Sequence, residues 1–172
     1  MPKSSSKRFS TGFTLIEIII VMAVIAVLAG ITLVALNPLE QLANANDTKT
    51  KQSVSKLGGL LTSFYAQRQV FPTADSDWIS DLMTTGDLNE RPASPQATCG
   101  PSAASDSNFC LQTSASSAIV YAQLSSLSQD RKWPIASEVP YVAFETSKGK
   151  SCIICASPNA TIPPGETCDV AQ

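Results

Sequence analysis

The sequence predicts an α+β fold in which one long N-terminal helix packs on a small antiparallel β-sheet. An uninterrupted apolar run opens the helix, and an amphipathic pattern of helical period follows it. The C-terminal half then holds short β-rich segments separated by turn residues. We expect four parts: a leader at residues 1–12, an apolar helical segment at 13–36, an amphipathic continuation at 37–70, and a small β-rich domain with a long loop and a cysteine-containing tail at 71–172.

The composition argues against several classes of protein. The chain has 172 residues, with 12 Lys and Arg against 14 Asp and Glu. Three of the basic residues lie in the leader, so the rest carries nine against fourteen. It shows no basic stripe with interleaved aromatic residues, so we expect no specific nucleic-acid partner. No nucleophile–base pair, phosphate loop or catalytic carboxylate pair stands out, so we expect a protein that is not an enzyme and uses no cofactor.

A membrane-length apolar segment occupies residues 13–36 and holds 24 residues with one charge, Glu17. As a helix it would extend about 36 Å, enough to cross the roughly 30 Å hydrocarbon core of a bilayer. The short leader before it is basic, with Lys3, Lys7 and Arg8. By the positive-inside rule we therefore expect a single pass through the cytoplasmic (inner) membrane, with the N-terminus in the cytoplasm and the remainder outside it.

Two simpler interpretations of this N-terminus explain only part of it. A secretory signal peptide would have an apolar core of about 7 to 15 residues and then a small-x-small cleavage site, and the run here is much longer. A plain signal anchor explains the length and the basic flank, but neither Glu17 nor the Gly12-Phe13 junction. A charge within the membrane costs about 2.5 to 3.5 kcal/mol of insertion free energy, so Glu17 is a candidate functional residue.

The residues Gly-Phe-Thr-Leu-Ile-Glu at positions 12–17 resemble the prepilin signature of type IV pilins and type II secretion pseudopilins. The resemblance implies a pilin-like fold and a structural subunit of an extracellular or periplasmic filament. It implies that a prepilin peptidase cuts after Gly12 and methylates the new N-terminal Phe13, while the apolar segment stays on the mature protein. The implied partners are that peptidase, other copies or homologous pilin subunits, and an assembly platform in the inner membrane.

The same resemblance gives Glu17 a role in subunit assembly together with Phe13. In this family the matching acid is taken to pair with the N-terminal amine of a neighbouring subunit. A lone buried carboxylate is costly, whereas one that faces an ammonium in a low dielectric is compensated. Such a pair would fix the axial offset between packed helices. The alternative is a glutamate that reaches the nearby membrane interface.

Asn37-Pro38 should interrupt the long helix, because proline lacks an amide donor and disfavours helical backbone at the residue before it. We expect the helix to resume at Leu39 and to end at Phe71-Pro72. Gly58-Gly59 weakens it but allows close packing against a sheet. Residues 44–52 are polar all round and should lie above the membrane. The apolar face that follows comprises Val54, Leu57, Leu60, Leu61, Phe64 and Tyr65.

A short helix is expected between residues 75 and 86, with Asp75 or Ser76 as its N-cap and Gly86 as its stop. Its apolar face comprises Trp78, Ile79, Leu82 and Met83. Residues 89–108 are rich in Pro, Ser and Ala and predict a long loop. Strands are expected at 118–124, at 141–147 and at 151–156, the last two joined through residues 148–150, with 109–113 as a short edge strand.

All five cysteines lie in the C-terminal half: Cys99, Cys110, Cys152, Cys155 and Cys168. Disulfides are the expected state outside the cytoplasm. Cys99 with Cys110 would close part of the long loop, and Cys168 with Cys152 or Cys155 would attach the tail to the sheet. Cys152 and Cys155 should point to opposite faces of one strand. The alternative function is a signal-anchored extracytoplasmic domain with thiol or metal chemistry at these two cysteines. With no histidine and no acidic cluster, we expect no metal site.

Overall fold

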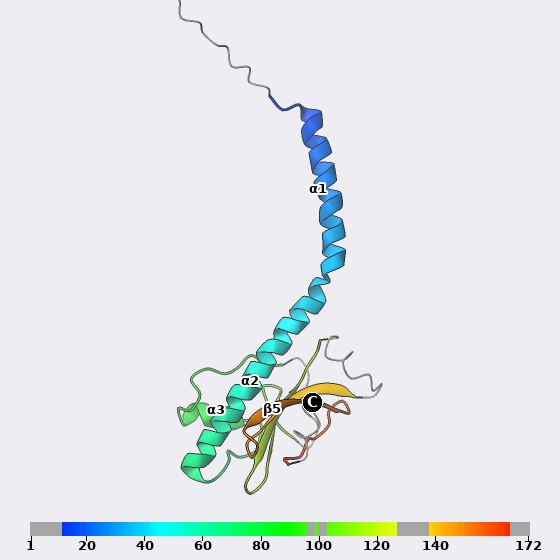
Figure 1. Cartoon of the computed structure of the whole chain (residues 1–172). Helices are drawn as coiled ribbons and strands as arrows, with labels where there is room; N and C mark the ends of the chain where they lie inside the picture. The colour runs from blue at the N-terminus through cyan, green and yellow to red at the C-terminus, as the bar shows by residue number, and fades with distance from the viewer. Residues whose placement is uncertain (1–11, 96–98, 100–102, 127–137, 166–172) are drawn as a thin grey trace, which may run out of the picture. The chain divides into compact units, whose positions relative to one another are not determined.

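The structure is a computed structural model that describes residues 12–95, 99, 103–126 and 138–165. The chain divides into two compact units at Pro38, and each is described by itself. The elements are α1 (Leu15–Leu36), α2 (Pro38–Arg68), α3 (Trp78–Thr84), β1 (Ala104–Asp106), β2 (Phe109–Thr113), β3 (Ala118–Gln123), β4 (Val139–Glu145) and β5 (Lys150–Ala156). This is the predicted α+β architecture (Figure 1).

The predicted interruption of the helix lies where the sequence places it. Helix α1 ends at Leu36, and the following Asn37 adopts a left-handed conformation with φ of 41°. Asparagine tolerates this conformation better than most residues and is a common helix stop. Pro38 then opens α2, at the position where a missing amide donor costs nothing.

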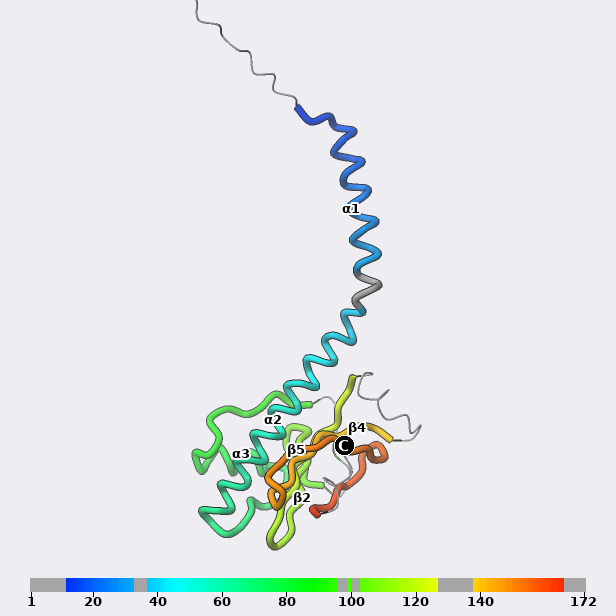
Figure 2. Tube along the Cα trace, in the orientation of Figure 1, coloured from blue at the N-terminus to red at the C-terminus, as the bar shows by residue number. Residues whose placement is uncertain are grey.

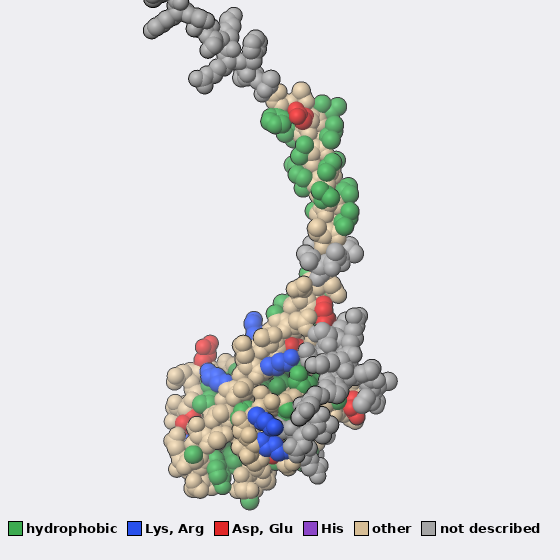
Figure 3. Space-filling model, in the orientation of Figure 1, with side chains coloured by type: hydrophobic (Ala, Val, Ile, Leu, Met, Phe, Trp, Pro, Cys, Tyr) green, Lys and Arg blue, Asp and Glu red, His purple; other side chains and the backbone are tan. Residues whose placement is uncertain are grey.

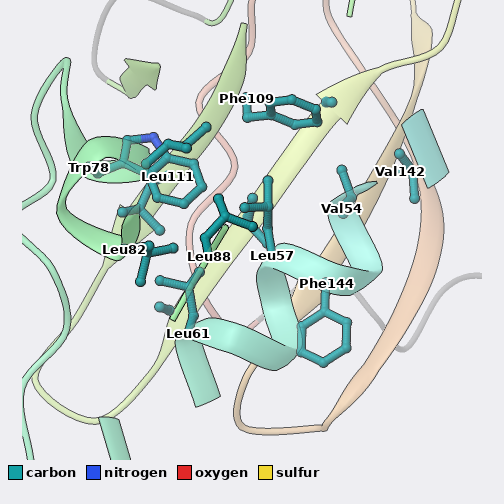
Figure 4. Packing of buried hydrophobic residues seen from close by; sticks show 14 of the residues in the cluster. Val54, Leu57, Leu61, Trp78, Leu82, Leu88, Phe109, Leu111, Val142 and Phe144 are labelled. Atoms are coloured by element: carbon teal, nitrogen blue, oxygen red, sulfur yellow. The ribbon is translucent and has the colours of Figure 1, made fainter. Parts of the chain in front are cut away.

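Helix α2 contributes most of its predicted apolar face to the main core, the exception being Tyr65, which stacks on Phe71. Val54, Leu57, Leu61 and Phe64 are buried, and Leu60 packs partly buried against the same core. They meet side chains from β2, β3 and β4, among them Leu111 of β2 (Figure 4). The spacing of three and four that predicts a helix therefore also marks the side that contacts the sheet.

The sheet has five antiparallel strands whose order in space follows their order in the chain. Figure 2 traces the path of the chain, with β2, β4 and β5 labelled. The prediction of residues 109–113 as an edge strand is wrong. Strand β2 lies between β1 and β3, so it is an inner strand, and β1 at 104–106 lies within the stretch predicted as a loop. The last connection also differs, because Lys150 already pairs with Glu145 in the sheet.

The two faces of the sheet are covered by different parts of the chain. Alternate residues of β3 point to opposite faces, so Val120 packs under α2 whereas Tyr121 belongs to a second cluster. That second cluster includes Ile162, from the segment that follows β5. The sheet is thus enclosed by α2 and α3 on one face and by the C-terminal segment on the other.

The predicted apolar face of helix α3 is confirmed only in part. Trp78, Ile79 and Leu82 are buried, but Met83 is exposed. The N-cap is Asp77 rather than Asp75 or Ser76, and its side chain makes no capping hydrogen bond. The backbone amide of Ile79 instead donates to Oδ2 of Asp106 at 3.0 Å. Gly86, with φ of 78°, follows the helix as predicted.

The adjacent glycines of α2 give a matched pair for a stability measurement. A Cβ on Gly58 would lie 2.1 Å from Cδ1 of Phe144, a ring buried in the core, whereas a Cβ on Gly59 would meet nothing within 4 Å. We expect Gly58→Ala to lower the free energy of unfolding by about 1–3 kcal/mol through overpacking. Gly59→Ala should raise it by about 1 kcal/mol through helix propensity. Urea unfolding of both variants tests this. Equal effects of the two substitutions on the free energy of unfolding would show that Gly58 makes no close contact with Phe144.

Candidate functional site

The candidate site is the N-terminal unit, where the structure leaves an apolar helix without a covering. Every residue of 12–32 is exposed, including Phe13 at 76% and Ile16 at 66%. On the face that Figure 3 shows, hydrophobic side chains line the helix, with an acidic group near its start. Residues 15–32 are long and apolar enough to cross a membrane, with a mean hydropathy of 2.8. A signal sequence would pass the same test, so this property alone does not define the function.

The predicted junction lies outside the helix. Gly12 and Phe13 have no helical structure, and the helix begins at Leu15 after the N-cap Thr14. The peptide bond between Gly12 and Phe13 is therefore in exposed, non-helical chain, where proteolysis is favoured. Lys3, Lys7 and Arg8 of the predicted leader fall outside the described residues.

Glu17 lies in the first turn of α1 and belongs to a local capping arrangement. Its backbone amide donates to the carbonyl oxygen of Thr14 at 3.1 Å and to Oγ1 of Thr14 at 3.3 Å. Thr14 and Glu17 occupy the first and last positions of the capping-box pattern. A carboxylate in the first turn also interacts favourably with the positive end of the helix dipole. This capping role was not predicted, although the spacing of Thr14 and Glu17 is its signal in the sequence.

Among the described residues of the globular unit, Cys99, Cys110 and Cys152 are in disulfide bonds. Cys99 and Cys110 form the disulfide expected from the sequence, which joins the preceding loop to β2. Cys152 is also disulfide-bonded, and Cys168 lies outside the described residues. Cys152 packs with the second cluster, whereas the adjacent Ile153 packs with the main core.

The disulfide at Cys152 bears on the alternative function of thiol or metal chemistry. A sulfur held in a disulfide is not the thiolate that binds a metal or attacks a substrate. Among the described residues, no group of three His, Cys, Asp or Glu side chains is placed to hold a metal ion. For Cys152, the disulfide therefore argues against that alternative.

Asp47 is a buried acid inside the stretch that the sequence predicts to be polar all round. It is 4% exposed. Its two carboxylate oxygens accept hydrogen bonds from the backbone amides of Ser125 and Ser126, at 2.8 and 3.1 Å. The hydroxyls of both serines donate to it as well. This residue joins α2 to the chain that leaves β3, and it could not be identified from helical spacing because its partners are remote in sequence.

Two tyrosines hold the C-terminal segment against the second face of the sheet. The hydroxyl of Tyr121 accepts from the amide of Ile162 at 3.3 Å, and that of Tyr141 accepts from the amide of Asn159 at 2.9 Å. Burial raises the pKa of both phenols above the ordinary value of 10, although these amide hydrogen bonds oppose the shift. The folded state therefore favours the neutral form of both phenols.

This arrangement predicts a loss of stability in alkali. Because the pKa of Tyr121 is higher in the folded than in the unfolded chain, its contribution is complete below pH 10 and falls as the pH rises through the folded pKa. Tyr121→Phe should cost about 1 kcal/mol at pH 7 through its lost hydrogen bonds, but its stability should fall less steeply above pH 10. Urea unfolding at pH 7, 9 and 11 measures both slopes. Parallel slopes would contradict the prediction.

The comparisons with known proteins bear on the N-terminal unit. Residues 7–33 match the family model described as the prokaryotic N-terminal methylation motif. Comparison with curated proteins and with solved structures found no match for the chain. The matched residues contain Gly12, Phe13 and Glu17, together with most of α1.

Proposed function

We propose that the chain is a structural subunit of a type IV pilus or a type II secretion pseudopilus. The premise is that it carries the signature of type IV pilins and pseudopilins. The observation that carries the proposal is the coincidence of this motif with a fully exposed apolar helix. Such a helix needs lipid or other helices around it, because its exposed side chains are unfavourable in water. A filament subunit meets both environments in turn.

The precursor is held in the cytoplasmic membrane by α1, with its basic leader in the cytoplasm. A prepilin peptidase cuts the exposed bond between Gly12 and Phe13 and methylates the amine of Phe13. An assembly platform in the inner membrane then moves the subunit into a filament with other copies or homologous pilins. Helix α1 exchanges lipid contacts for helix contacts in this step, so its apolar surface stays covered throughout.

Glu17 directs this packing. In the first turn of α1 its carboxylate is close to the end of the chain that cleavage creates. Between packed helices it pairs with the amine of Phe13 in a neighbouring copy, and the pair compensates the desolvation of both charges. Only one axial offset of the two helices brings these charges together, so the pair fixes the register.

Intact mass of the protein isolated from filaments tests the proposal. We expect a chain that lacks residues 1–12 and carries one added methyl group, located on Phe13 by fragmentation. A chain of full length, or one cleaved at another bond, would contradict the proposal. A membrane fraction from cells without the peptidase is the control and should retain the precursor.

A further inference from the structure

A groove with a cationic wall lies between α2 and the segment 88–93 of the globular unit. It has a volume of about 330 Å³. Lys49 and Lys56, both exposed, line it from α2, and Leu57 and Leu88 form its apolar part. The two lysines are seven residues apart, so they lie on the same side of the helix, about 10 Å apart along its axis. Figure 3 shows Lys and Arg side chains on the face of this unit turned to the viewer.

Within the part of the chain that the structure describes, the charges of this groove are incompletely balanced. The third cation of its lining, Arg91, forms an ion pair with Asp106. Among the described residues, no acid forms an ion pair with Lys49 or Lys56. Glu90 is the acid of the lining, and it offers one negative charge beside two lysines. The groove therefore favours an anionic partner.

An acidic segment at residues 75–81 has the complementary charge. Asp75 and Asp77 are exposed and Asp81 is half-buried, and within the described residues none of them is in an ion pair. The segment is anchored by the buried side chains of Trp78 and Ile79, and it lines no part of the groove of its own copy. The exposed Asp75 and Asp77 are therefore carried by a segment that buried side chains hold in place.

We propose that the groove binds the acidic segment 75–81 of a neighbouring copy in the filament, with Lys49 and Lys56 facing Asp75, Asp77 and Asp81. This inference rests on the proposed function. A filament of identical subunits needs a heterologous contact, in which two different patches of each copy are complementary. The opposite charges of the groove and the segment provide such a pair of patches outside the membrane helix.

Charge reversal in filament-forming cells tests the proposal with the full-length chain. We expect Lys49→Glu with Lys56→Glu to lower the yield of sheared filaments about tenfold, because like charges then face each other. Asp77→Lys with Asp81→Lys should cause a similar loss. Combining the four substitutions should restore most of the yield. Lys150→Glu is the matched control, an exposed lysine on β5 that should assemble as wild type.

Cross-linking separates this contact from a general effect of charge. Carbodiimide treatment of filaments mixed from light and heavy isotope subunits should give mixed-isotope cross-links between the lysines of the groove and the aspartates of the segment. Normal yield in both reversed variants, no rescue in the combined variant, or cross-links confined to single copies would each overturn the inference. A wild-type chain that is processed normally but never enters a filament would instead overturn the proposed function.

Discussion

Glu17→Ala should be cleaved and methylated like the wild type, yet enter filaments about a hundredfold less. In the proposed function, cleavage acts at the exposed junction Gly12-Phe13, which precedes the helix and does not involve the Glu17 side chain. Assembly of the variant would then leave the amine of Phe13 desolvated without its partner. An unpaired buried charge costs about 3 kcal/mol or more, which corresponds to roughly a hundredfold. Immunoblots of the membrane and sheared filament fractions, with intact mass of the membrane form, measure both steps.

Two further variants separate the charge of Glu17 from its place in the helix cap. Glutamine also suits the last position of the capping-box pattern, which Glu17 occupies. Glu17→Gln therefore keeps the cap and removes the charge. Thr14→Ala removes the hydroxyl that accepts from the Glu17 amide and keeps the charge, at a cost of about 1 kcal/mol of helix stability. We expect Glu17→Gln to fail in assembly and Thr14→Ala to assemble. The reverse result would assign Glu17 to the cap.

Gly12→Val should leave uncleaved precursor in the membrane. Nothing in the chain itself opposes a larger residue here, because a Cβ on Gly12 would meet no atom within 4 Å. A block in processing would therefore come from the peptidase, whose site must accept the residue before the cut bond. We expect a loss of the mature form of at least tenfold, seen as a slower band on an immunoblot and as the full-length mass.

Gly30→Ala is the matched control for this substitution. Gly30 lies within α1, and a Cβ there would also meet no atom within 4 Å. Its replacement should slightly favour the helix and leave processing unchanged. Normal processing of Gly12→Val, or an equal block in both variants, would contradict the assignment of Gly12 to the cleavage site.

Much of this fold was predictable because its strongest signals are local. The break at Asn37 follows from the geometry of proline, and the buried face of α2 follows from the helical spacing of Val54, Leu57 and Leu61. Strand β3 is an unbroken β-rich run. These features depend on neighbouring residues in the sequence, so one sequence is enough to locate them.

The features that the sequence analysis missed depend on contacts between remote residues. Strand β1 is three residues long and carries no hydrophobic alternation, and it is recognisable through its pairing with β2. The carboxylate of Asp106 in that strand accepts a hydrogen bond from the amide of Ile79. The carboxylate of Asp47 accepts hydrogen bonds from the amides of two serines far along the chain. A polar residue gives no periodic signal, so the partner of such a carboxylate becomes evident only in the folded chain.

The tyrosine contacts with residues 157–162 also determine when the globular unit can finish folding during synthesis. The ribosome releases each strand before the next, and the order of the strands in the sheet lets each one pair with the strand before it. The second face of the sheet cannot be covered at that stage. The amides of Ile162 and Asn159, which donate to Tyr121 and Tyr141, come after the last strand in the chain. A chain truncated before residue 159 would therefore lack both of these contacts and leave this face of the sheet without Ile162.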